Sequence, residues 1–406
     1  MTLLFEILLT VSLVFCCAQV VAAWLHRRPD YAARRPAYQA AATSLPPVSI
    51  LKPLSGLDDQ LAENLESFCR LDYPSYELVF CLQDPQDKAL PLVRELRARH
   101  PDAEISIVVG DYRGALNPKV ANLIPGYRAA RHELVLVSDA NVRVAPGYLR
   151  EAVSHLDDPR VALVSHLVRG TGAGTIGAAL DNGYLNGFIF GSVSLLDRLG
   201  TSCVIGKSML MRRAELDQIG GFEAVQGYLA EDFMLAALFK KNGRRVVISP
   251  APVDRVCRDQ ETRGFLRRCI RWNAMRRTVS GPGYALEPLT NPTLLSLCLL
   301  GVAIATGDVT DRVLVLSGSA LAAKVALDAG MHTLLGAAPR IRELPLTPVR
   351  DMLLIWAWAA GYFTRSIEWR GYTLSIARNT RLVSRGPFHP VDEAPAAHPE
   401  AVAATE

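Results

Sequence analysis

The feature that most constrains the fold of this chain is an almost uninterrupted apolar run near its amino terminus, from Leu3 to Leu25. A stretch of about 20 apolar residues can span a lipid bilayer as a helix. A cleaved signal peptide is the alternative, with a weak cleavage site at Val21–Ala23, but its positive charge would precede the apolar run. Here the basic residues His26–Arg28 follow it. We therefore predict an uncleaved anchor whose amino terminus lies outside, with the chain after it in the cytosol.

Composition narrows the class of protein further. Half of the 406 residues are hydrophobic, which fits a soluble body joined to a few membrane segments. The net charge is +4, and much of the basic charge lies near the apolar segments. No basic run is interleaved with aromatic residues, which argues against nucleic-acid binding. The eight cysteines form no CxxC pattern. Scattered cysteines with apolar neighbours indicate reduced, buried thiols and a body that faces the cytosol.

Strand-like and helix-like stretches alternate between residues 48 and 138. The expected strands are 48–54, 76–82, 105–109 and 134–138, and the expected helices are 61–69, 88–100 and 119–131. Such alternation predicts a mostly parallel α/β sheet. Ligands of such sheets bind at the carboxyl ends of the strands, and Lys52, Asp84 and Asp139 fall there.

Three apolar stretches follow the α/β part. Leu289–Gly307 is long enough to span a bilayer, whereas Val313–Ala338 contains Lys324, Asp328 and His332 and is a less clean span. The third, Met352–Thr364, is too short to cross comfortably and has arginines after it. Because a crossing would put those arginines outside, we expect this stretch to be interfacial or re-entrant.

These patterns divide the chain into consecutive parts. We predict an anchor over 1–26, a linker over 27–47, a catalytic α/β domain over 48–285, a membrane region over 286–370, and a basic segment with a disordered tail over 371–406. The glycine-rich stretch 170–191 has weak apolar patterning. It predicts a flexible or interfacial segment, or a plain surface loop.

Four polar groups of residues lie along the α/β part: Gln83-Asp84, Ser138–Asn141, Glu231-Asp232 and Arg268–Trp272. Each one alone has an ordinary explanation, since an aspartate after a strand is usually a turn former or a helix cap. Paired arginines are often solvated or lipid-facing. In this order, at strand ends and ahead of membrane segments, the four groups together predict a site that holds a proton acceptor and an anion.

These motifs resemble those of the ceramide glucosyltransferase family, which are membrane-anchored, family-2-like glycosyltransferases with the GT-A fold. The family pattern of three spaced aspartates followed by (Q/R)xxRW corresponds to Asp84, Asp139, Asp232 and Arg268–Trp272. Further matching stretches are Ile50–Leu54, Leu71–Pro74, Asn117–Lys119, Gly206–Met209 and Leu216–Gln218. The resemblance covers about residues 48–280. It departs from the family at Asp139-Ala140-Asn141, which has no second carboxylate, and over 184–200, which matches poorly.

The resemblance implies inverting transfer of a hexose, with glucose favoured, from a UDP-sugar to the hydroxyl of a ceramide-like lipid. In that reading Asp232 is the general base, with Glu231 as its competitor, and Asp139 binds Mg²⁺ or Mn²⁺. The donor would be bound by residues along the whole α/β part: Lys52, Asp84 at the uracil ring, Lys119, Asp139, Arg268 and Arg271 at the phosphates, and Trp272 at the sugar or the acceptor.

Other functions fit the sequence less well. Within the same class, a hopanoid or diacylglycerol could replace the ceramide, and the sugar is left open among hexoses. A processive polysaccharide synthase is disfavoured because only two spans follow the catalytic part. A dead transferase fold serving as a membrane scaffold would not need all three aspartates together with the arginine–tryptophan motif.

Overall fold

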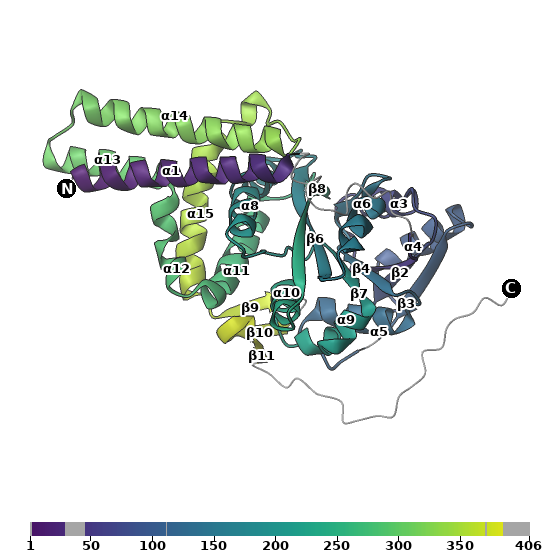
Figure 1. Ribbon diagram of the computed structural model, residues 1–406. Helices are drawn as coiled ribbons and strands as arrows, with labels where there is room; N and C mark the ends of the chain where they lie inside the picture. The colour runs from purple at the N-terminus through teal and green to yellow at the C-terminus, as the bar shows by residue number, and fades with distance from the viewer. Residues whose placement is uncertain (1, 29–44, 111, 370–371, 385–406) are drawn as a thin grey trace. The chain divides into compact units, whose positions relative to one another are not determined.

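The computed structural model describes residues 2–28, 45–110, 112–369 and 372–384 (Figure 1). The predicted linker and the predicted tail lie mostly outside these residues. The chain forms two compact units, which are interleaved along the sequence rather than consecutive as the sequence analysis divided them. The first unit comprises Met1–Ala32, Leu167–Cys203 and Cys257–Arg365, and the second comprises Ala33–His166, Val204–Val256 and Ser366–Glu406.

The second unit is built on an eight-stranded mixed sheet with the order β3-β2-β1-β4-β7-β6-β8-β5. Its strands are β1 Val48–Pro53, β2 Tyr76–Leu82, β3 Glu104–Val109, β4 Leu134–Ser138, β5 Val142–Arg143, β6 Val161–Thr171, β7 Ser208–Arg212 and β8 Arg245–Val256, and β6 continues into the first unit. The strands β3, β2, β1 and β4 are parallel, and β7 is antiparallel to β4. The predicted α/β class is confirmed, and these four parallel strands lie within one residue of the predicted ranges.

Both faces of the parallel strands are covered, since every residue of β1 and β4 is buried. The helices of this unit are α3 Leu61–Phe68, α4 Ala89–Arg99, α5 Pro118–Ala129, α6 Tyr148–Ser154, α9 Arg213–Gln218 and α10 Glu231–Lys241. Continuous apolar runs such as Leu134–Val137 explain this burial, since a strand with one wet face would alternate.

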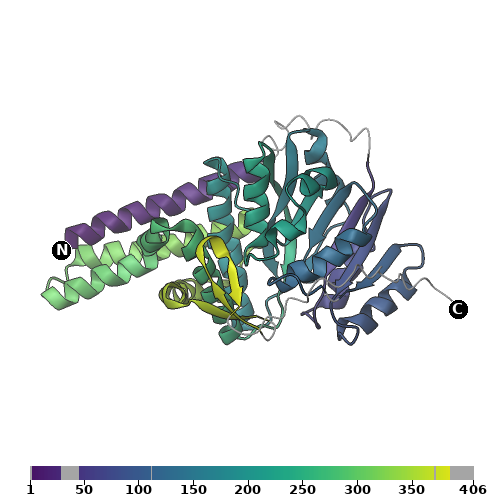
Figure 2. The same ribbon diagram turned by 90° about the horizontal axis from the view of Figure 1, so that it is seen from below.

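A second, three-stranded antiparallel sheet lies near the carboxyl terminus, where the sequence suggested only a basic segment (Figure 2). Its strands are β9 Ser366–Trp369, β10 Tyr372–Ile376 and β11 Leu382–Ser384. Leu374 and Ile376 alternate along β10 and are buried, together with Leu382 on β11. This short alternation was masked in the sequence by the many arginines around it.

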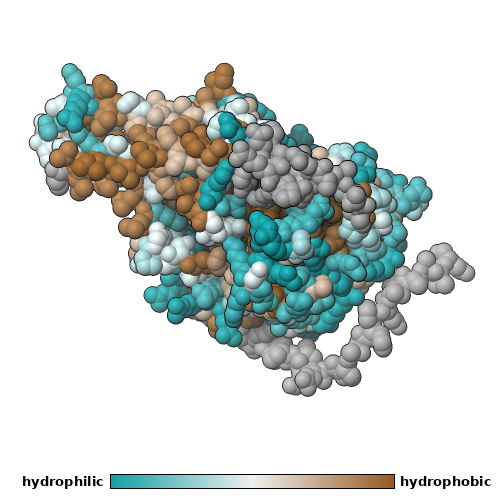
Figure 3. All heavy atoms as spheres, in the orientation of Figure 1, coloured by the Kyte–Doolittle hydropathy of each residue, from teal (hydrophilic) through white to brown (hydrophobic). Residues whose placement is uncertain are grey.

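The first unit is helical. Its helices are α1 Thr2–Arg27, α7 Ile176–Tyr184, a π-helical turn Leu185–Ile189, α8 Phe190–Arg198, α11 Thr262–Ser280, α12 Pro282–Leu286, a 3₁₀ turn Glu287–Thr290, α13 Pro292–Thr306, α14 Asp311–Leu334 and α15 Leu346–Phe363. Helices α1, α13 and α14 lie side by side and share a core that includes Leu9, Leu299 and Ala320 (Figure 1). Apolar side chains, drawn in brown, cover much of the face of these helices that Figure 3 shows.

Among the residues that the structure describes, two helices, α1 and α14, are long and apolar enough to cross a membrane. A third span results only if α13 is counted together with the helical turns before it, from which it is bent by 69°. The sequence had favoured the first of the two later stretches, but Pro292 begins α13 and Gly307 ends it, so this helix has only 15 residues. The third stretch forms an 18-residue helix, α15, which starts earlier than expected and is not among the candidate spans.

The expectation of a flexible segment or loop over residues 170–191 is wrong. This stretch is the end of β6, helix α7, the π-helical turn and the start of α8. Its glycines allow close packing: a Cβ at Gly177 would lie 2.3 Å from the backbone oxygen of Gln260, and one at Gly191 would lie 2.8 Å from Met331.

Candidate active site

Three carboxylates and two lysines of the second unit form one cluster, which we call the carboxylate cluster. Its members are Lys119, Asp139, Lys207, Glu231 and Asp232. The strand pairing explains part of the arrangement, since β4 and β7 are antiparallel and Ser138 lies opposite Ser208. The residue that follows β4 therefore lies beside the residue that precedes β7.

Lys119, in the first turn of α5, occupies the centre of this cluster. Its Nζ donates to the backbone oxygen of Gly206 at 2.8 Å and lies 2.8 Å from Asp139 Oδ1 and 2.9 Å from Glu231 Oε1. Burial alone would lower the pKa of Lys119, but the carboxylates outweigh it and hold the pKa above its usual range. The ammonium therefore stays charged and joins two of the carboxylates.

Asp139 binds two ammonium groups, one with each of its oxygens. Lys207 Nζ donates to Asp139 Oδ2 at 2.7 Å and to Asn141 Oδ1 at 2.9 Å, while Lys119 binds Oδ1. Burial works to raise the pKa of Asp139, but these two cations hold it well below the usual range. Asp139 therefore stays ionised at neutral pH, and each of its oxygens binds one ammonium group.

Asp232 lies in the first turn of α10, as the sequence predicted. Its oxygens accept hydrogen bonds from the backbone N–H of Gly206 at 2.6 Å and of Phe233 at 2.8 Å. Burial raises the pKa of this carboxyl to about 6, and the neighbouring Glu231 adds to the shift, which Lys119 partly opposes. A Cβ at position 206 would lie 2.9 Å from Asp232 Oδ2, so the close approach of this backbone requires a glycine.

Glu231 is engaged by side chains at both of its oxygens. One binds Lys119, and the other accepts a hydrogen bond from Asn117 Nδ2 at 3.1 Å. Asn117 is buried and caps α5 by accepting from the N–H groups of Lys119 and Val120. Glu231 thus connects the starts of α5 and α10, whereas Asp232, which is only partly buried, makes hydrogen bonds to the backbone.

Lys52 does not point out of the sheet edge as its position at the end of β1 suggested. The side chain is fully buried, with Nζ over the ring of Phe68 at 3.7 Å from its centroid. It donates to the backbone oxygen of Asp139 at 2.7 Å and to Ser138 Oγ at 3.3 Å. Burial lowers the pKa of Lys52 to about 7. Lys52 therefore holds the end of β4 and the backbone of Asp139 in place through these two hydrogen bonds.

Asp84 follows β2 and is exposed. Its side chain accepts a hydrogen bond from the N–H of Gln86 at 2.8 Å, and its backbone oxygen accepts one from Asp87. This is the turn geometry that favours an aspartate after a strand, and it leaves carboxylate lone pairs facing solvent.

The arginine–tryptophan motif lies on α11, in the first unit. Arg268 forms an ion pair with Asp181, a fully buried residue of α7, and its guanidinium lies 4.7 Å from the ring centroid of Trp272. Trp272 also contacts the ring of Tyr184. The sequence offered Arg268 as a donor of hydrogen bonds to phosphate. In the structure its partner is a carboxylate of its own unit.

One residue near the carboxylate cluster was missed by the sequence analysis altogether. Thr380, between β10 and β11, is fully buried and accepts hydrogen bonds from Leu229 N–H at its backbone oxygen (2.9 Å) and from Ala230 N–H at its hydroxyl (3.3 Å). Its φ of +63° is unusual for a β-branched residue. A strained residue thus holds the backbone just before Glu231 and Asp232.

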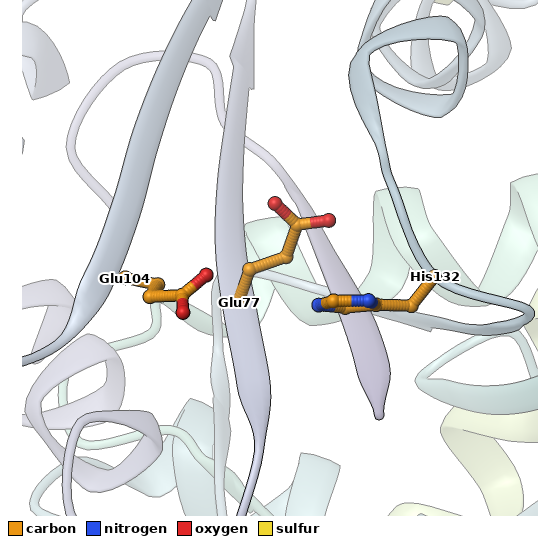
Figure 4. A group of neighbouring side chains, drawn as sticks. All are labelled: Glu77, Glu104 and His132. Atoms are coloured by element: carbon orange, nitrogen blue, oxygen red, sulfur yellow. The ribbon is translucent and has the colours of Figure 1, made fainter. Parts of the chain in front are cut away.

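Another group of possible metal ligands lies at the opposite end of the sheet, at the amino ends of β2 and β3. Figure 4 shows Glu77 between Glu104 and His132. The carboxylate of Glu77 already accepts hydrogen bonds from Ser49 Oγ and from the backbone and guanidinium of Arg131, at 2.6–2.9 Å. Arg131 also binds Glu104 and thus supplies the positive charge that a metal would bring. We assign this group a structural role.

Several known proteins are similar to this chain. Over 248 residues the chain is 34% identical to ceramide glucosyltransferase 1 of Caenorhabditis elegans. This matched region makes up 61% of this chain and 53% of that relative. Over 302 residues the chain is 28% identical to the ceramide glucosyltransferase of Komagataella phaffii, covering 60% and 59%. The chain thus spans little more than half the length of these relatives.

A solved structure of a mannosyltransferase from Pyrobaculum calidifontis, in complex with GDP-mannose and Mn²⁺, is also similar. It is 21% identical, covers 88% of this chain and 99% of its own, and has a TM-score of 0.47. The model of glycosyl transferase family 21 matches residues 7–382, which is most of the chain. The resemblance seen in the motifs is thereby confirmed, and the chain belongs to glycosyl transferase family 21.

Proposed function

We propose that this protein is an inverting glycosyltransferase that moves a hexose, with glucose favoured, from a UDP-sugar to the hydroxyl of a ceramide-like membrane lipid. One observation carries the proposal: Asp139 and Asp232 meet around Lys119 at the carboxyl ends of the parallel strands, where ligands of α/β sheets bind. The ceramide glucosyltransferases among the relatives support the choice of sugar and acceptor.

In the proposed reaction the lipid hydroxyl oxygen attacks the anomeric carbon of the sugar. The bond from that carbon to the diphosphate oxygen breaks, UDP leaves, and Asp232 takes the hydroxyl proton. A pKa of about 6 suits this task, because the carboxylate is mostly ionised at neutral pH and still basic enough to accept a proton. Glu231 is a poorer candidate, since Lys119 and Asn117 occupy its two oxygens.

The leaving diphosphate needs positive charge. Lys119 and Lys207 bring two ammonium groups to Asp139, and the oxygens of Asp139 and Asn141 are the hard ligands that Mg²⁺ or Mn²⁺ prefers. Asp139 would be the carboxylate ligand of such an ion, with Asn141 beside it, once the ammonium groups that bind these oxygens in the structure have moved aside. When bound, such an ion would neutralise charge on the diphosphate.

Metal dependence is tested by chelation. Treatment with EDTA should abolish transfer, and added Mg²⁺ or Mn²⁺ should restore it. Full activity in the presence of chelator would leave the two lysines as the groups that neutralise the diphosphate and would remove the metal from the proposal.

Further residues are proposed to bind the donor. Asp84 would accept the N–H of the uracil ring through its exposed carboxylate. Arg271 would bind phosphate oxygens with its guanidinium fork. Arg268, whose charge is balanced by Asp181, would hold Trp272 in place, and Trp272 would pack against the sugar or the acceptor.

We further propose a multi-pass membrane protein whose catalytic part faces the cytosol. Helices α1 and α14 are the candidate spans, and the basic residues Arg27 and Arg28 follow the apolar part of α1. Single cysteines near residues 35 and 385, in a cysteine-free background, should both resist a membrane-impermeant thiol reagent in intact cells. Labelling at 385 alone would mean that α15 crosses the membrane.

The function itself is tested by expressing the chain in a host that supplies UDP-glucose and ceramide. Mass spectrometry of the host lipids should reveal a hexosylated ceramide that is absent when Asp232→Asn is expressed at the same level. A hexosylated hopanoid or diacylglycerol in its place would change the acceptor, and unchanged lipids would refute the proposed activity.

A further inference from the structure

A cavity within the first unit lies among α1, the π-helical turn after α7, α11, α14 and α15. The empty space of this cavity, including the solvent at its open side, is about 770 Å³. Apolar side chains form part of the lining, among them Val20, Leu327, Met331, Leu354 and Ile355. Both candidate membrane spans contribute, so a molecule dissolved in a bilayer could reach it.

One side of this cavity is formed by a group of buried charges, which we call the membrane-helix charge cluster. Lys324 Nζ lies 2.6 Å from Asp328 and 3.8 Å from Asp351, and Arg350 binds both of these aspartates. Asp351 also accepts a hydrogen bond from Thr293 Oγ1 at 2.7 Å. Two cations thus face two anions. Ionisable residues inside a membrane region are costly and point to a functional site.

A second ion pair also lines the cavity. Arg276, on α11 just beyond the arginine–tryptophan motif, binds Glu287 and lies over the ring of Phe188. Two cations, Lys324 and Arg276, line the cavity with the three carboxylates, and Arg350 does not line it but binds two of them, so the three cations and three carboxylates balance. Each of these cations is paired with a carboxylate, so the group has no net positive charge. Asn273, Gln19 and Asn291 add uncharged polar groups to the lining.

From this charge balance we infer that the cavity binds the headgroup of an uncharged lipid that carries hydroxyl and amide groups, and that it excludes lipids with a phosphate headgroup. The inference rests on the proposed function, whose acceptor it places in the first unit. A neutral headgroup can exchange hydrogen bonds with the amides and carboxylates around it. A phosphate would be desolvated next to Asp328, Asp351 and Glu287 with no unmatched cation to compensate it, which is strongly unfavourable.

The test uses a matched pair of probes, a diazirine-bearing ceramide and its 1-phosphate, each incorporated into phosphatidylcholine vesicles that contain the full chain. After irradiation, the labelled peptides are identified by mass spectrometry. Ceramide should label α14 and α15 near Leu327 and Ile355. Its 1-phosphate should label them at least about tenfold less, because burying an unmatched anion costs more than one charge-assisted hydrogen bond returns.

Two variants sharpen this test. Leu327→Trp fills the cavity and should reduce ceramide labelling severalfold, whereas Val315→Trp, on an exposed face of the same helix, should leave it unchanged. Glu287→Gln leaves Arg276 unmatched and should raise labelling by the phosphorylated probe by about tenfold relative to ceramide, the scale of one charge-assisted hydrogen bond.

Equal labelling by both probes, or no response to Leu327→Trp and Glu287→Gln, would overturn the inference. Hydrolysis of UDP-glucose, measured on phosphatidylcholine vesicles that contain the full chain but neither probe, separates this inference from the proposed function. Hydrolysis without selective ceramide labelling would refute the cavity alone. Selective labelling without turnover of any UDP-sugar would uphold the cavity and refute the transferase proposal.

Discussion

The carboxylate cluster of the second unit and the membrane-helix charge cluster of the first are both networks of lysine, arginine and carboxylate, yet they differ in access to water. In the carboxylate cluster, the side chains of Lys119, Lys207 and Asp139 are 15–22% exposed. In the other, Lys324, Asp328, Arg350 and Asp351 are 4–10% exposed. Partial hydration lowers the energy needed to exchange partners, so the carboxylate cluster can rearrange around an incoming diphosphate. The membrane-helix charge cluster is more tightly fixed.

The comparison predicts that the two clusters respond differently to the loss of one charge. A cluster that can rearrange keeps the stability of the fold when one charge is lost, but turnover falls. A fixed cluster loses stability, because a remaining charge is left buried without a partner.

The largest expected effect is therefore on the stability of the first unit. Asp328→Asn removes the anion that binds both Lys324 and Arg350, and it should lower the free energy of unfolding by about 3–5 kcal/mol, the cost of breaking a buried ion network. The measurement is thermal unfolding of the purified chain in detergent. Asp308→Asn, at an exposed position before α14, serves as the control and should stay within about 0.5 kcal/mol of wild type. Equal shifts for both variants would contradict the comparison.

The next largest effect is on turnover in the second unit. Asp232→Asn should retain UDP-sugar binding and lose at least about a hundredfold in kcat, the usual scale of general-base catalysis. Glu231→Gln should cost less, because Glu231 orients Lys119 without taking the proton. If Asp232→Asn turned over at nearly the wild-type rate while Glu231→Gln were dead, Glu231 would be the base.

The same carboxylate predicts the pH dependence of the rate. Because burial raises the pKa of Asp232 to about 6 in the free protein, its ionised fraction, and with it kcat/KM, should fall roughly tenfold between pH 7 and pH 5. For stability the sign is opposite: a raised pKa in the folded state means that this group stabilises the fold in acid, and that this contribution is lost as pH rises through about 6. A pH–rate profile of the wild type tests the prediction, and the residual rate of Asp232→Asn should show no such fall.

Much of this arrangement was predictable from the sequence. The parallel strands are continuous apolar runs buried on both faces, a strong signal that fixed their bounds to within a residue. The position of Asp232 at a helix start followed from the apolar pattern after it. Being at the carboxyl end of a strand, however, predicts only the edge of a sheet. It did not reveal that Lys52 points inward while Asp84 points to solvent.

Contacts between distant segments were not predictable in the same way. No local pattern pairs Arg268 with Asp181, and glycines that allow close helix packing, such as Gly177, have the same composition as a loop. Lys324 and Asp328 were visible as charges in an apolar stretch and made it a doubtful span. Their partners on α15 lie too far along the chain to be recognised from the sequence.

The smallest effect is expected at Thr380, which is 150 residues from its partner Ala230. Its hydroxyl accepts the Ala230 N–H just before the Glu231-Asp232 pair, so Thr380→Ala should lower kcat by about three- to tenfold, the value of one hydrogen bond that positions a group. Thr380→Ser keeps the hydroxyl and removes the branch that strains a residue at a φ of +63°, so it should match the wild-type rate and be slightly more stable.

The ratio of kcat between the two variants, measured together with their unfolding temperatures, separates positioning from strain. If Thr380→Ser were as slow as Thr380→Ala, the hydroxyl would not be the group that matters, and the backbone contact of Thr380 with Leu229 would be the remaining link between the small sheet and the carboxylate cluster. If both variants kept the wild-type rate, the carboxylate cluster would hold Asp232 without help from the chain beyond residue 365. The expected result, a slow alanine variant beside a wild-type-like serine variant, makes the small sheet part of the catalytic unit.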